Sequence, residues 1–127
     1  MSPEHTKQLI EDFPTLYGNL DPRSPMAWYG FQCADGWFDL LYGLSAKVAA
    51  VSPAIKVIQV KDKFHELRFY TTHGGLTQEQ KDTFYDHIRE AEIASRLTCE
   101  ICGNPVEPSD DWQDWSDCKS HRGTDGT

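Results

Sequence analysis

The sequence is short of positive charge and of long apolar runs. It carries 12 Lys and Arg against 20 Asp and Glu, and the resulting net charge of −8 opposes non-specific attachment to nucleic acid or to an anionic membrane. No apolar run approaches the roughly 20 residues that cross a bilayer. The first residues also lack the basic-then-apolar pattern of a secretory signal. We therefore expect a cytoplasmic protein without membrane contact.

The sequence also lacks the short motifs of common enzymes. It contains no nucleophile elbow, no glycine-rich phosphate loop and no cluster typical of an open catalytic metal site. We therefore expect a protein that is not an enzyme.

Two stretches in the first half have helical periodicity, and a stretch rich in glycine and proline separates them. Residues 4–13 predict a short helix that ends before Pro14. Residues 17–34 predict a long loop whose aromatic side chains pack elsewhere. Asp35 is expected to cap a helix over residues 36–51. The apolar face of this second helix consists of Trp37, Leu40, Leu41, Leu44, Val48 and Val51.

The second half predicts a hairpin followed by a long helix. Residues 55–61 and 67–72 are rich in β-branched and aromatic side chains, which favours two strands. The connector 62–66 is short enough to join them as a β-hairpin. A capping box at Thr77 opens a helix over residues 78–97. Its inner face consists of Phe84, Ile88, Ala91 and Ser95.

Length and composition favour one globular domain, because the chain has 127 residues, 39% of them apolar and 25% charged. An isolated hairpin is marginally stable in water, so helices must cover one of its faces or a third strand must join it. We predict an α+β fold in which two or three helices pack a small hairpin or sheet. Residues 1–98 form this core, and residues 99–127 form a zinc ribbon or knuckle that packs on the last helix.

Three cysteines and a histidine near the C-terminus have the spacing of a structural zinc site. Two residues separate Cys99 from Cys102, fifteen follow before Cys118, and two more lead to His121. In a reducing cytosol this pattern predicts thiolate ligands about 2.3 Å from Zn²⁺ rather than disulfides. Four ligands leave no open position, so the site is structural. Cys33 is the alternative to His121 as fourth ligand, and otherwise a small buried thiol.

The predicted hairpin combines basic and aromatic side chains. The segment 54–70 carries four basic and two acidic groups, a balance of +2. Within it, the basic and aromatic side chains of residues 61–70 are Lys61, Lys63, Phe64, His65, Arg68, Phe69 and Tyr70. Such a composition is typical of a surface that binds phosphate, stacks a base or meets an acidic protein patch. In the simpler interpretation Leu67 and Phe69 face the core, and Lys61, Lys63 and Arg68 form a solvated face.

Two tryptophans lie among acidic residues between the two halves of the predicted zinc site. Trp112 and Trp115 are candidate anchors for a partner, because tryptophan is enriched at binding hot spots. Alternatively, they pack against the zinc module and Leu97.

Three motifs follow one another along the chain. They are Gly36-Trp37-Phe38 at the start of a helix, VKDKFHELRFY at residues 60–70, and CEICG at residues 99–103 with a terminal CKSH. In this order, over about residues 33–121, they resemble a group of small proteins encoded by tailed phages and prophages. The resemblance implies a phage setting and a zinc-bearing tail with Cys99, Cys102, Cys118 and His121 as ligands. The sequence departs from the group at His65 and Glu66, where glycine is frequent.

The leading functional hypothesis is a zinc-stabilised phage accessory protein that binds a host protein stoichiometrically, since small non-structural phage proteins commonly act so, in some cases on a defence system. The candidate partner-binding residues are Lys61, Lys63, Arg68, Tyr70, Trp112 and Trp115. The alternative is a nucleic-acid or nucleotide binder that uses the basic aromatic hairpin. In either case the protein acts in the cytoplasm of the host cell.

Overall fold

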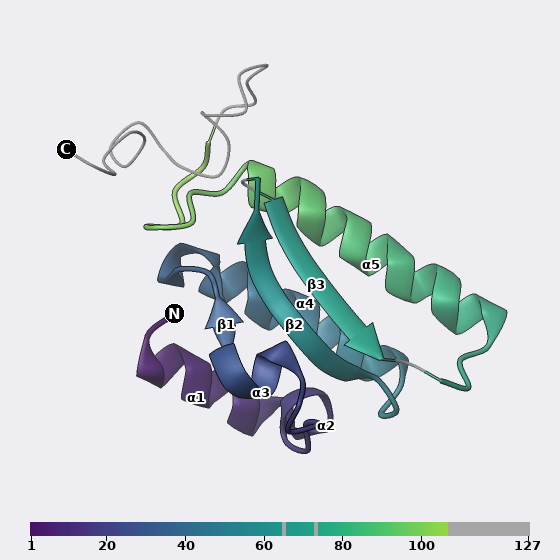
Figure 1. Ribbon diagram of the computed structural model, residues 1–127. Coiled ribbons are helices and arrows are strands. Elements are labelled where there is room, and N and C mark those ends of the chain that lie inside the picture. Colours follow the sequence, from purple (N-terminus) through teal and green to yellow (C-terminus); the bar gives the residue numbers. More distant parts are fainter. Residues whose placement is uncertain (65, 73, 107–127) are drawn as a thin grey trace.

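The computed structural model describes residues 1–64, 66–72 and 74–106, and over these residues the chain is α+β, as predicted. Short helices come first, a longer helix and a hairpin follow, and a long helix precedes the cysteine motif (Figure 1). The elements are α1 (Pro3–Asp12), α2 (Pro14–Tyr17), α3 (Pro25–Tyr29), β1 (Phe31–Gln32), η1 (Asp35–Trp37), α4 (Phe38–Val51), β2 (Lys56–Lys63), β3 (Glu66–Thr72) and α5 (Gln78–Arg96).

The sheet has three strands in the order β1-β2-β3. β2 and β3 form the predicted antiparallel hairpin, with Val60 opposite Phe69, and β1 adds to β2 in parallel. Figure 1 shows α4 behind β2 and β3, while α5 runs alongside β3, and the opposite face of these strands is turned to the viewer. Both solutions expected for a marginal hairpin are therefore present, because helices cover one face and a third strand joins the sheet.

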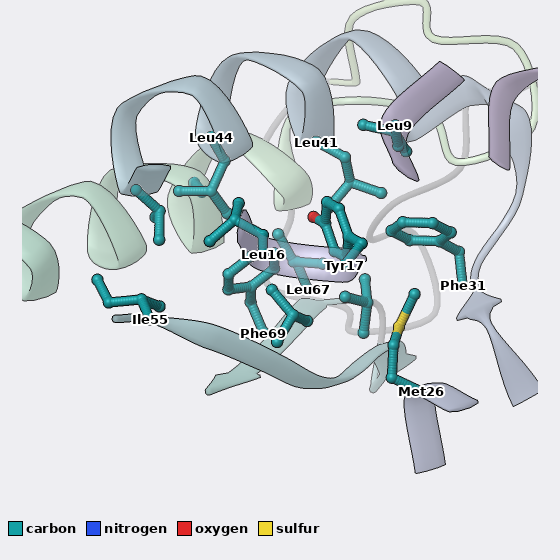
Figure 2. Packing of buried hydrophobic residues seen from close by; sticks show 14 of the residues in the cluster. Leu9, Leu16, Tyr17, Met26, Phe31, Leu41, Leu44, Ile55, Leu67 and Phe69 are labelled. Carbon is teal, nitrogen blue, oxygen red and sulfur yellow. The ribbon is translucent and has the colours of Figure 1, made fainter. Parts of the chain in front are cut away.

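The hydrophobic core lies between α4 and the inner face of the sheet (Figure 2). Trp37 is fully buried there, as predicted, with Leu41, Leu44 and Val48 of α4. Phe84, Ala91 and Ser95 supply the buried face of α5, and the Thr77 capping box is present. Amphipathic periodicity therefore identified the inward faces of both long helices correctly.

The predicted long loop over residues 17–34 is wrong in part, because it contains α3 and β1. The side chain of Ser24 caps α3 by accepting a hydrogen bond from the Ala27 amide, and a proline occupies the first helical position. Not all of its aromatic side chains pack, either. Trp28 and Tyr29 are 73% and 70% exposed.

Asp35 does not cap the second helix as predicted. It begins the 3-10 turn η1, and α4 starts only at Phe38. The Asp35 carboxylate instead accepts a hydrogen bond from the Ser2 amide, and His5 Nδ1 lies 3.0 Å from the same oxygen. These interactions lower the pKa of Asp35, the Ser2 amide having the larger effect. The carboxylate thus attaches α1 to the start of α4.

The hairpin connector is shorter than predicted, because Lys63 pairs with Glu66. Phe64 follows β2 with a φ of 55°, a left-handed conformation that is uncommon for a residue other than glycine, and its side chain is exposed. No helix among the described residues is long and apolar enough to cross a membrane.

Candidate functional site

The first two predicted zinc ligands lie on a tight turn over residues 98–106, which we call the knuckle. Thr98 and Pro105 form an antiparallel bridge, and the Cys99 amide donates to the Asn104 carbonyl at 2.8 Å. The Gly103 amide donates to the Cys99 carbonyl, also at 2.8 Å, and Gly103 has a φ of 81°. Because this conformation favours glycine, Gly103 allows the chain to reverse directly after Cys102.

The knuckle sits on the beginning of η1 through contacts that the sequence analysis did not predict. The Gly36 amide donates to the Glu100 carbonyl at 2.6 Å, and Trp37 Nε1 donates to the Thr98 carbonyl at 3.0 Å. A Cβ atom at Gly36 would collide with the carbonyl oxygens of Cys99 and Glu100. The knuckle therefore packs on Gly36 and Trp37. A residue with a Cβ atom does not fit at position 36, which explains the glycine in η1.

The described part of the predicted zinc site carries two of its four proposed ligands. Cys99 is buried and Cys102 is exposed on the same turn, and a Cys-x-x-Cys turn supplies two thiolates to one ion. Cys118 and His121 lie outside the described residues. Within residues 1–64, 66–72 and 74–106, no three His, Cys, Asp or Glu side chains gather closely enough to hold a metal.

Cys33 has the environment of a buried, protonated thiol. Only 7% of its surface is exposed, and burial, with the nearby Glu100 carboxylate, raises its pKa from the ordinary 9.0 to about 12. The Glu100 carboxylate is held there because its Oε2 accepts a hydrogen bond from the Ala34 amide at 2.8 Å. A thiol in this state is protonated at neutral pH and is therefore a poor nucleophile.

The raised pKa of Cys33 predicts a loss of stability in alkali. Because the folded-state pKa lies above the unfolded value, the burial of the neutral thiol stabilises the fold fully below about pH 9, and this contribution disappears as the pH rises toward 12. The free energy of unfolding of wild type should fall more steeply than that of Cys33→Ala between these values. Urea titrations at about pH 8 and pH 11 measure the difference, and parallel pH profiles would contradict the assignment.

The outer face of the hairpin carries the predicted basic and aromatic side chains side by side. Across the strands Lys61 is opposite Arg68, and Gln59 is opposite Tyr70. Lys63 follows on β2 at the exposed end of the hairpin. Since Leu67 and Phe69 point into the core, as predicted, these alternate positions share the opposite face. We refer to Gln59, Lys61, Lys63, Arg68 and Tyr70 as the outer face.

Arg68 differs from the two lysines because its charge is neutralised locally. Its Nη1 lies 2.7 Å from Glu66 Oε1 and 3.4 Å from Glu92 Oε2. Glu66 also faces Arg96, whose Nε lies 3.1 Å from Oε2. These partly buried ion pairs connect β3 to α5. Arg68 therefore holds the hairpin against the helix and contributes less positive charge to the outer face than its sequence position indicates.

The remaining candidate anchors, Trp112 and Trp115, lie outside the described residues. The structure shows two exposed aromatic side chains that sequence reasoning placed wrongly, Trp28 and Tyr29 on α3. The signal for α3 was present in the Ser24-Pro25 pair, which resembles an N-cap followed by proline at the first helical position.

A groove of about 800 Å³ lies between α4 and α5 beside the knuckle. Four of its charged side chains pair with one another. Lys47 Nζ lies 3.8 Å from Glu90 Oε2, and His5 lies against Asp35. His87 Nδ1, also in the lining, is buried without a hydrogen-bond partner among the described residues. Because the opposite charges are paired, we assign no ligand to this groove.

Comparison of the chain with protein-family models, with curated proteins and with solved structures gives no match.

Proposed function

We propose that this protein is a zinc-stabilised accessory protein that binds another protein stoichiometrically through the outer face of its hairpin. The observation that carries the proposal is the position of Lys61, Lys63 and Tyr70 on a sheet face over which no described helix lies (Figure 1). A sheet face in a small domain is ordinarily covered or polar. Here a half-exposed tyrosine lies beside two lysines in a chain with a net charge of −8.

The metal in this proposal is a structural Zn²⁺ held by Cys99, Cys102, Cys118 and His121. The knuckle supports it because a tight turn closed by Gly103 carries the first two thiols. Four protein ligands leave no position for a substrate, so the ion would cross-link the chain and have no catalytic role. The function proposed is accordingly binding and not catalysis.

A host protein is the proposed partner, and phage infection is the proposed setting. The support is the resemblance of the VKDKFHELRFY and cysteine motifs to small tailed-phage proteins. Small non-structural phage proteins commonly bind a host factor, in some cases in a defence system, and the same role in the host cytoplasm is proposed for this chain.

Nucleic-acid or nucleotide binding is the second candidate, and charge makes it the weaker one. Glu66 and Glu92 neutralise Arg68, so Lys61 and Lys63 are the basic groups left on the outer face. A phosphate backbone is held by several cations at once. Two lysines in an acidic protein are better suited to an acidic protein patch, with Tyr70 as the aromatic contact.

Charge reversal distinguishes the roles of Lys61 and Arg68. Lys61→Glu should abolish capture of the partner from infected cells while leaving the melting temperature unchanged, because a lysine on a strand keeps its charged end in solvent. Arg68→Glu should lower the free energy of unfolding by about 2 kcal/mol, because it places a third carboxylate beside Glu66 and Glu92. Lys81→Glu on α5 changes the net charge equally and is the matched control.

Nuclease-treated pulldowns and thermal melts of the three variants test this proposal. Binding retained by Lys61→Glu would move the interface to Trp112 and Trp115. A steep decrease of binding to single-stranded DNA, RNA or mononucleotides with increasing salt would instead favour the second candidate.

A further inference from the structure

β3 is an edge strand, because the sheet order is β1-β2-β3. Backbone groups alternate along a strand, so every second residue of β3 directs its N–H and C=O away from β2. The Leu67 amide shows which set this is, since it donates to Ser95 Oγ of α5 at 2.9 Å. Phe69 belongs to the same set, and no group in the described part of the chain takes its amide on that edge.

A groove of about 300 Å³ lies along this edge between β3 and α5. The nearly buried Phe84 and the partly buried Ile88 supply its apolar floor, while Tyr70 and Tyr85 line it with 42% and 52% of their surfaces exposed. Figure 1 shows that α5 lies close to the beginning of β3 and diverges from it toward the other end. The Leu67–Ser95 hydrogen bond joins β3 to α5 at one end, and the groove lies beyond it along Phe69 and Tyr70.

We infer that this groove binds an extended peptide segment of the partner protein, which adds to the sheet as a fourth strand beside β3. The backbone of the segment would pair with the N–H and C=O of Phe69, and an apolar side chain would lie on Phe84 and Ile88. Main-chain pairing of this kind supplies affinity, and the alternate side chains supply specificity. Arg68 and Glu92 line the groove as an ion pair, so the inserted stretch should be uncharged, whereas an acidic patch of the partner would meet Lys61 and Lys63 on the adjoining outer face.

An extended segment fits this edge better than a second copy of the chain. Pairing of two β3 edges would bring a whole sheet, with its own α5, against the helix that flanks the groove. The Leu67 amide already donates its hydrogen bond to Ser95 Oγ, so it cannot pair with an added strand. The length of β3 that is available for pairing is therefore short. A single peptide strand needs only the width between β3 and α5.

This inference rests on the proposed protein-binding function and specifies how the partner is bound. Tyr70 belongs both to the outer face and to the groove, so the two surfaces are continuous. The two claims still fail separately, because Lys61→Glu alters the outer face alone and Tyr85→Ala alters the groove alone.

The test uses the full chain, purified with Zn²⁺ in the buffer, and random linear heptapeptides displayed on an immobilised surface. Enriched peptides should alternate apolar residues and avoid Asp and Glu.

N-methylation of the central amide of an enriched peptide removes one main-chain donor and should weaken binding about tenfold. Tyr85→Ala should weaken it about fivefold. Tyr29→Ala, which removes an exposed tyrosine on α3, is the matched control. Hydrogen exchange at the Phe69 amide should slow when the peptide binds.

Absence of enrichment would overturn the inference, as would peptides that bind Tyr85→Ala or N-methylated backbones equally well. Phe69 protection that depends on protein concentration without peptide would assign the edge to a second copy. If the peptide results are negative while Lys61→Glu still loses the partner, strand addition fails and the outer-face proposal stands.

Discussion

Replacing Trp37 with alanine is expected to lower the free energy of unfolding by about 3–5 kcal/mol, because the substitution opens a large cavity in the core. Trp37 is fully buried among α4 residues, and its Nε1 donates to the Thr98 carbonyl. The side chain thus contributes to the core and also holds the knuckle. We expect the variant to unfold at much lower urea concentration than wild type and to expose the knuckle to protease.

Trp37→Phe separates these two contributions. It keeps most of the apolar volume and removes the donor to Thr98, so the free energy of unfolding should fall by about 1–3 kcal/mol. If Trp37→Ala kept its melting temperature and lost a binding partner instead, the apolar stripe of α4 would be a binding surface and the packing described here would be wrong.

The elements predicted well from the sequence are those in which one short stretch contains all the information. The helix after Trp37 and the helix after Thr77 repeat apolar residues at helical spacing, and the capping box is a local hydrogen-bond pattern. The hairpin strands alternate buried and exposed residues for the same reason. Such patterns reflect the burial of one face, and the neighbouring element need not be known.

The features missed are those that depend on residues far apart. β1 has two residues and exists only because Phe31 lies beside Val60. Asp35 satisfies the local rule for an N-cap, yet Ser2 and His5 occupy its carboxylate. Local propensity therefore yielded to tertiary contacts at both places.

The candidate sites also differ in whether they depend on a local pattern or on residues far apart in the sequence. The spacing of Cys99 and Cys102 is local, and the structure places both on one turn as expected. From the sequence, Arg68 is either a solvated cation or paired with a neighbouring carboxylate such as Glu66 or Asp62, and the pair with Glu66 is present. Its second partner, Glu92, lies on α5, and the hairpin sequence alone does not indicate that contact. Charge counted along a segment does not reveal which charges are already paired across the fold.

Zinc content is expected to depend on Gly36, although this residue is distant in sequence from every proposed ligand. We expect one Zn²⁺ per chain by elemental analysis, lost in Cys102→Ser and retained in Cys33→Ser, because Cys33 belongs to neither half of the Cys99-Cys102 and Cys118-His121 spacing. Loss of zinc from Cys33→Ser would bring that residue into the coordination sphere and exclude His121.

Gly36→Ala tests the contact between the knuckle and η1 without changing a proposed zinc ligand. The added Cβ would collide with the carbonyl oxygens of Cys99 and Glu100, and overpacking of this kind costs about 1–3 kcal/mol. Because structural zinc sites couple binding to folding, the same cost should reduce zinc affinity by about 5- to 150-fold in a chelator competition. Gly43→Ala on α4 is the matched control, since nothing lies within 4 Å of its added Cβ. It should bind zinc normally and gain about 0.5–1 kcal/mol from the better helix propensity of alanine. Equal zinc affinity in the two variants would show that the knuckle binds metal independently of its contact with η1.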